Sequence, residues 1–96
     1  MKTEYQLHII NRLRDLRQKR NLSQAQVATS LGISTGQMGN IETPKASHKY
    51  TIGQIYTICN DFKISVADIF LSDEEKKLPI NDQINALIKY IVEYEQ

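Results

Sequence analysis

LSQAQVATSLGISTGQMGNIE, residues 22–42, predicts two short helices joined by a tight turn. Ser23 is a suitable N-cap for the first helix. The apolar residues of that helix recur at the spacing of one buried face: Val27, Ala28 and Leu31. Gly32 can adopt the left-handed conformation that ends this helix and turns the chain sharply. Ser34 can then cap the second helix, which extends to about residue 42.

The second helix has separate apolar and polar sides. Met38 and Ile41 are placed on the apolar side, and four residues face away from the core: Thr35, Gly36, Gln37 and Asn40. This is the layout of a helix-turn-helix reader, in which the second helix lies in the major groove of DNA. Side-chain amides can donate to and accept from adenine at once, so Gln37 and Asn40 are the strongest base-reading candidates. Thr35 is a candidate for contact with a thymine methyl group or a phosphate, and Gly36 can offer only its backbone or a close approach. The alternative for Gln37 and Asn40 is ordinary solvated surface.

The pattern extends well beyond these two helices. Residues 9–24, IINRLRDLRQKRNLSQ, and residues 52–70, IGQIYTICNDFKISVADIF, complete a match over roughly residues 9–71. In this order the segments resemble the Cro and phage-repressor group of helix-turn-helix proteins, the XRE family. The resemblance implies an all-α fold, a compact five-helix lambda-repressor-like DNA-binding domain. It also implies a small bacterial or phage-type transcription regulator that binds double-stranded DNA and acts as a repressor by occupying an operator.

The resemblance also assigns roles to residues around the reading helix. It implies phosphate contacts at the helix starts and in the loop after the reading helix: Gln24, Ser34, Lys45, His48, Lys49 and Tyr50. It further implies a structural salt bridge between Arg17 and Glu42 that holds the reading helix at a fixed angle. The alternative is that Arg17 contacts a phosphate directly. Pro44 stands where the family commonly has a glycine, so this loop is expected to follow its own path.

The composition excludes several classes of protein. Ninety-six residues with 41% hydrophobic content are enough for one small core without metal or disulfide support. The single cysteine, Cys59, shares a predicted helix face with Ile55 and Phe62, which favours a buried apolar role. No catalytic constellation, metal-ligand set, ligand pocket or membrane-length apolar run is evident. We therefore expect a cytoplasmic, nucleoid-associated protein that is not an enzyme and has no cofactor.

The charges are unevenly distributed along the chain. Residues 1–50 contain eight basic and three acidic side chains, whereas residues 51–96 contain four basic and eight acidic ones. This asymmetry predicts a basic face in the first half that meets phosphate, and an acidic second half that faces away from DNA. The alternative is a solvated helix surface.

Four further helices are expected, at about residues 3–19, 51–62, 65–71 and 79–94. The predicted division is a DNA-binding domain over residues 1–71, a charged linker over 72–78 and a C-terminal amphipathic helix over 79–96. The apolar residues of the last helix are candidates for dimerisation: Ile80, Ile84, Leu87, Ile88 and Ile91. A homodimer would read two half-sites. The alternatives are that this helix folds back on its own core, or that it binds a protein partner, as in an antitoxin-type module.

Overall fold

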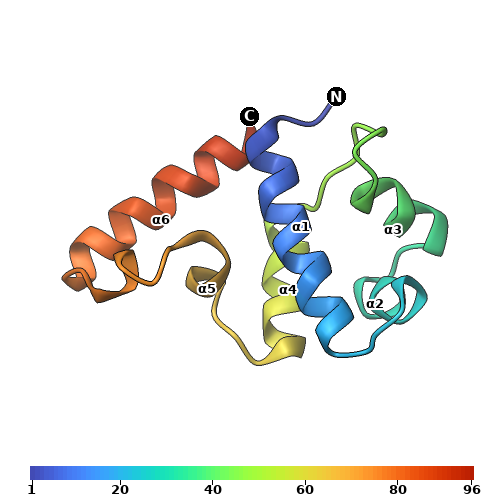
Figure 1. Ribbon diagram of the computed structural model, residues 1–96, viewed down its shortest axis with the longest axis horizontal. Coiled ribbons are helices and arrows are strands. Elements are labelled where there is room, and N and C mark those ends of the chain that lie inside the picture. Colours follow the sequence, from blue (N-terminus) through green and yellow to red (C-terminus); the bar gives the residue numbers. More distant parts are fainter.

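Six α-helices and no strands make up the chain in the computed structural model, which describes all of residues 1–96 (Figure 1). The α-helices are α1 Glu4–Lys19, α2 Gln24–Leu31, α3 Thr35–Glu42, α4 Ile52–Phe62, α5 Val66–Phe70 and α6 Ile80–Glu95. A short 3-10 turn, η1 Glu75–Lys77, precedes α6. The predicted all-α fold with an additional C-terminal helix is confirmed. No helix combines the length and the apolar character needed to cross a membrane.

The helices begin where short polar residues can cap them. The first five α-helices each have a capping box, in which a Ser or Thr side chain accepts from the third helical N–H and the third side chain bonds back. The pairs are Thr3 with Gln6, Ser23 with Gln26, Ser34 with Gln37, Thr51 with Gln54, and Ser65 with Asp68. Gly32 has the expected left-handed conformation, with φ of 69°, and Asn21 after α1 has one too, with φ of 56°. These caps fix the ends of short helices and hence the geometry of the turn between α2 and α3.

One hydrophobic core joins all six helices. It combines apolar side chains of the first five helices with Tyr94 from the last turn of α6. Cys59 is part of this core, and burial raises the pKa of its thiol to about 11. The thiol is therefore neutral at ordinary pH and acts as a small apolar side chain.

Helix α6 folds back on α1 and α5 (Figure 1). Leu87 and Ile91 are partly buried against the core, so these two dimerisation candidates serve intramolecular packing. A second face of the helix carries exposed apolar residues at four-residue spacing: Ile80, Ile84, Ile88 and Val92. Val92 was missed because periodicity alone does not tell which side of a broadly apolar helix docks on the core. We call these four residues the α6 stripe.

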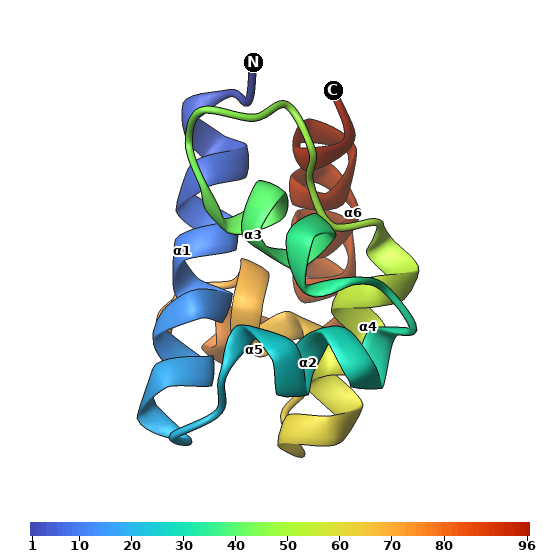
Figure 2. The ribbon, with the colours of Figure 1, turned by 90° about the vertical axis from the view of Figure 1, so that its right-hand side faces the viewer.

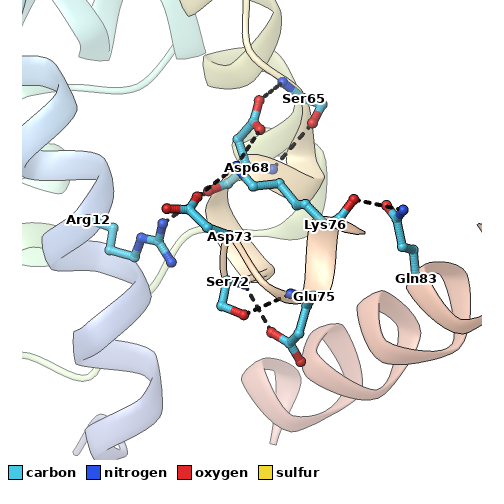
Figure 3. A network of polar contacts seen from close by, with 8 residues as sticks. All are labelled: Arg12, Ser65, Asp68, Ser72, Asp73, Glu75, Lys76 and Gln83. Carbon is cyan, nitrogen blue, oxygen red and sulfur yellow. Dashed lines mark hydrogen bonds and ion pairs between the residues drawn. The ribbon is translucent and has the colours of Figure 1, made fainter. Parts of the chain in front are cut away.

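The stretch 72–78, predicted to be a charged linker, makes polar contacts with its neighbours (Figure 3). Lys76 Nζ lies 3.2 Å from Asp68 Oδ1 on α5, and Gln83 on α6 donates to the Lys76 carbonyl at 3.0 Å. From the other side, Arg12 on α1 donates to the Asp68 carbonyl at 3.1 Å. This network holds α5, η1 and α6 together, because each element supplies one of its donors or acceptors.

Asp68 provides a test of this network through pH. The Ser65 N–H that donates to its carboxylate, together with Lys76, holds the pKa of Asp68 below its ordinary value of 3.8. A lowered carboxyl pKa stabilises the fold above the ordinary value, and this contribution is lost as the pH falls through the lower folded pKa. We expect Asp68→Asn to remove part of the acid-induced loss of stability, measured by urea unfolding from about pH 5 downwards. Asp61→Asn, at an exposed carboxylate without an ion pair, is the control and should leave the pH profile unchanged.

Candidate nucleic-acid interface

Helices α2 and α3 pack on each other through the turn at Gly32 and present one face of the molecule (Figure 2). The turn is closed by Ile33 N–H, which donates to the Ala28 carbonyl at 3.0 Å. Met38 and Ile41 of α3 are buried, as expected. The other side of α3 is solvent-exposed along the four predicted reading residues: Thr35, Gly36, Gln37 and Asn40. The helix thus offers a polar face of the size and shape that fits a major groove.

The side-chain amides of Gln37 and Asn40 differ in whether they form hydrogen bonds within the protein. Gln37 Oε1 accepts from the Ser34 N–H at 2.9 Å, as part of the capping box of α3. Only the amino group of Gln37 is therefore available unless the cap opens. The Asn40 side chain makes no hydrogen bond within the protein, so both its donor and its acceptor are free. Bidentate pairing with adenine is consequently open to Asn40 without loss of an intramolecular contact.

An ion pair fixes the end of α3 to α1. Arg17 Nε and Nη2 donate to the two carboxylate oxygens of Glu42, each at 2.8 Å, and Arg17 Nη1 donates to the Leu22 carbonyl at 2.7 Å. Gln24 Nε2 adds a bond to Glu42 Oε1 at 2.9 Å. Arg17 is only 7% exposed and Glu42 only 3%. The structure thus contains the salt bridge that the resemblance implies, and every nitrogen of the guanidinium is used inside the protein.

The predicted phosphate contacts do not all reach the surface. Lys45 and His48 are exposed, and the backbone N–H of Gln24 is free at the start of α2. Tyr50, in contrast, is 1% exposed, with its hydroxyl 3.7 Å from the sulfur of Met38, so its side chain is a core residue. Lys49 Nζ donates to the carbonyls of residues 94 and 95 at the end of α6. The Ser34 hydroxyl accepts from the Gln37 N–H and remains exposed beside the polar side of α3.

The basic surplus of residues 1–50 is largely used within the fold. Five of its eight basic side chains bond to protein groups: Lys2, Arg12, Arg17, Arg20 and Lys49. The basic face expected from the charge count thus stays a prediction, and it would rest mainly on the exposed side chains of Arg14, Lys19, Arg20 and Lys45. Arg14, which the sequence reasoning missed, lines a polar hollow of about 250 Å³ together with Gln24 and Gly39. Its exposure on the α2 and α3 side makes it a further cation near the reading helix.

A tight turn between two short helices, an exposed polar face on the second and a buried ion pair behind it define a helix-turn-helix DNA-binding domain. The family described as "Helix-turn-helix domain" matches residues 10–75, and the chain belongs to this family, of the XRE and Cro-like kind. Membership implies DNA binding and a part in transcription regulation. No curated protein and no solved structure matches the chain.

Proposed function

We propose that the protein is a sequence-specific regulator that binds duplex DNA and represses transcription by occupying an operator. The observation that carries this proposal is the free, exposed face of α3, held in place by the buried pair of Arg17 and Glu42. Asn40 and Gln37 are the principal base readers, with Thr35 and Gly36 approaching bases at the start of the helix. Residues 1–71 supply this interface, and α6 supplies the assembly surface.

Phosphate contacts in this proposal come from the rim of the interface. The Gln24 N–H and the positive end of the α2 dipole favour one phosphate. Ser34, Lys45 and His48 meet the backbone on the α3 side, and Arg14 adds a cation near Gln24. Lys49 and Tyr50 are not included, because the structure engages both within the protein.

We also propose that the α6 stripe pairs with the stripe of a second copy. An antiparallel arrangement, with a two-fold axis between Ile84 and Ile88, places Ile80 of one copy opposite Val92 of the other. In the same register, Lys77 lies just before α6 of one copy and comes close to Glu95 at the end of α6 of the other copy. Both residues are exposed. The two ends of α6 are thus complementary in charge as well as in helix dipole. Two copies joined in this way can present two reading helices to two half-sites.

Selection of bound duplexes from a random library, followed by sequencing, tests the function. An enriched inverted repeat supports a dimeric, sequence-specific regulator, and an enriched single half-site supports a monomeric one. Absence of enrichment contradicts the proposal and favours the alternative of a protein-binding module, as in antitoxins, which the exposed α6 stripe also fits. Ile84→Glu should convert a dimer to a monomer in sedimentation, with the equally exposed Asn85→Glu as the control.

Replacing Asn40 by alanine should weaken binding to the selected site by about 1–3 kcal/mol and relax the base preference at one position. Gln37→Ala should give a similar loss of affinity, together with a small loss of stability because it also removes a capping bond. Titration of the preferred duplex and of single-base variants measures both effects. An equal loss of affinity on all sequences would contradict base reading by these residues.

Replacing Lys45 by glutamine should make the dependence of log K on log salt shallower by about one unit, as expected for one lost phosphate contact. The expected change does not depend on the sequence of the duplex. Lys89→Gln, at an exposed lysine on α6, is the matched control and should leave the slope unchanged. An unchanged slope for Lys45→Gln would remove this residue from the interface.

A further inference from the structure

The loop after α3 has little backbone hydrogen bonding of its own. A short turn covers residues 44 and 45, and no backbone group of residues 47–50 is hydrogen-bonded to another backbone group. In Figure 2 this loop arches over the end of the molecule at which both termini lie. We propose that Lys2 and Tyr94, which lie outside the family match over residues 10–75, are positioning residues that fix this loop and the end of α3 for DNA binding.

Lys2 holds the start of the loop. Its Nζ donates to the Asn40 carbonyl at 3.0 Å and also to the Thr43 carbonyl, and the residue is 6% exposed. Burial lowers the pKa of this ammonium, so the contact is made at a desolvation cost. Helix α3 has no basic residue in its own last turn, and Lys2 supplies the cation that favours a helix C-terminus. Lys2 therefore bonds directly to the backbone of Asn40, the proposed base reader whose side-chain amide has no partner in the protein.

Tyr94 holds the end of the loop. Its hydroxyl donates to the Tyr50 carbonyl at 2.8 Å, and its side chain is fully buried. Its own carbonyl accepts from Gln6 Nε2 of α1 at 2.7 Å. Lys49 Nζ donates to the Glu95 carbonyl at 3.0 Å, so a second loop residue is anchored to the same turn of α6. The last turn of α6 is thus joined to α1 on one side and to the loop on the other.

Two anchors at opposite ends of a stretch with few backbone hydrogen bonds determine where its exposed residues lie. Lys45 and His48 lie between these anchors, so their distance from the DNA backbone depends on both contacts. Lys2 also bonds to the Asn40 carbonyl, so the position of the end of α3 depends on the same anchor. This role in DNA binding rests on the proposed function, whereas the order of the loop does not.

The Tyr94→Phe variant tests the second anchor, because it keeps the buried ring and removes only the hydroxyl donor. Tyr56→Phe is the matched control, since it also removes a tyrosine hydroxyl, at a residue that is 58% exposed. Lys2→Met, with Lys89→Met as its control, tests the first anchor in the same way. All four variants are compared as full-length chains, at a temperature at which each is folded.

The first measurement is backbone ¹⁵N relaxation of the free protein. In Tyr94→Phe and Lys2→Met we expect the order parameters of residues 45–50 to fall from about 0.85 toward 0.6, with no change in the controls. The second measurement is DNA affinity at several salt concentrations. We expect about five-fold weaker binding, the size of one net hydrogen bond, and a salt slope shallower by about one unit.

Each outcome decides a separate point. Unchanged order parameters, or an equal fall in the controls, would overturn the anchoring of the loop. A more mobile loop with unchanged affinity and salt slope would overturn its role in DNA binding, because a merely structural contact changes stability without changing the number of phosphate contacts. If the wild-type chain bound no duplex, the proposed function would fail, and the relaxation data would still decide whether the two residues anchor the loop.

Discussion

Arg17→Ala should lower the free energy of unfolding by about 3–5 kcal/mol, because it leaves the Glu42 carboxylate buried without its ionic partner. The pair is bidentate, with both bonds at 2.8 Å, and a third Arg17 bond holds the Leu22 carbonyl at the entry to α2. Only Gln24 would remain as a donor to Glu42. Urea unfolding measures the loss. At temperatures where the variant is still folded, its affinity for DNA should also fall, since α3 loses its anchor on α1.

The rival view, that Arg17 contacts phosphate, predicts lost affinity with unchanged stability. Arg14→Ala is the matched control, because Arg14 is exposed and lies three residues earlier on the same helix. It should leave stability within about 0.5 kcal/mol of the wild type. Replacing both partners, by Arg17→Met with Glu42→Leu, should recover much of the lost stability, since a buried ion pair can often be exchanged for apolar contact. Failure of the double variant to recover would show that the cost is not that of a stranded charge.

The helix-turn-helix and the exposed polar face of α3 could be predicted from sequence because they depend on local signals. Gly32 had to take a positive φ, and Ser23 and Ser34 had to precede helices, whatever the rest of the fold did. The same local chemistry marks other helix starts in the chain. A Ser or Thr followed three residues later by Gln marks the first four helix starts, and this signal was present in the sequence at Thr3 and Thr51.

The anchors of the loop could not be predicted, because they join residues that are far apart in the chain. Lys2 meets carbonyls 38 and 41 residues later, and Tyr94 meets Tyr50 across 44 residues. A lone lysine near a terminus and one tyrosine in an apolar helix carry no spacing signal for such contacts. The charge count has a related limit, because it does not show which basic side chains also bond to carbonyl groups of the protein.

Tyr94→Ala should destabilise the whole chain by about 3–5 kcal/mol, the usual cost of emptying a large buried aromatic site. Tyr94 is fully buried, packs edge-on against Phe70 with ring centroids 6.1 Å apart, and belongs to the same core cluster as Ile10 of α1. The loss should appear as a single unfolding transition, recorded by circular dichroism and by tyrosine fluorescence.

Tyr56→Ala, at the exposed tyrosine of α4, controls for removal of an aromatic ring and should change stability by no more than about 0.5 kcal/mol. If residues 1–71 formed a domain that is stable by itself, Tyr94→Ala would release α6 and leave the main transition where it is. A shift of the whole transition would mean that α6 completes the core of the DNA-binding domain. Any partner that binds the α6 stripe would then act on a helix whose last turn also holds the loop beside the reading helix, so assembly and DNA binding would be coupled through Tyr94.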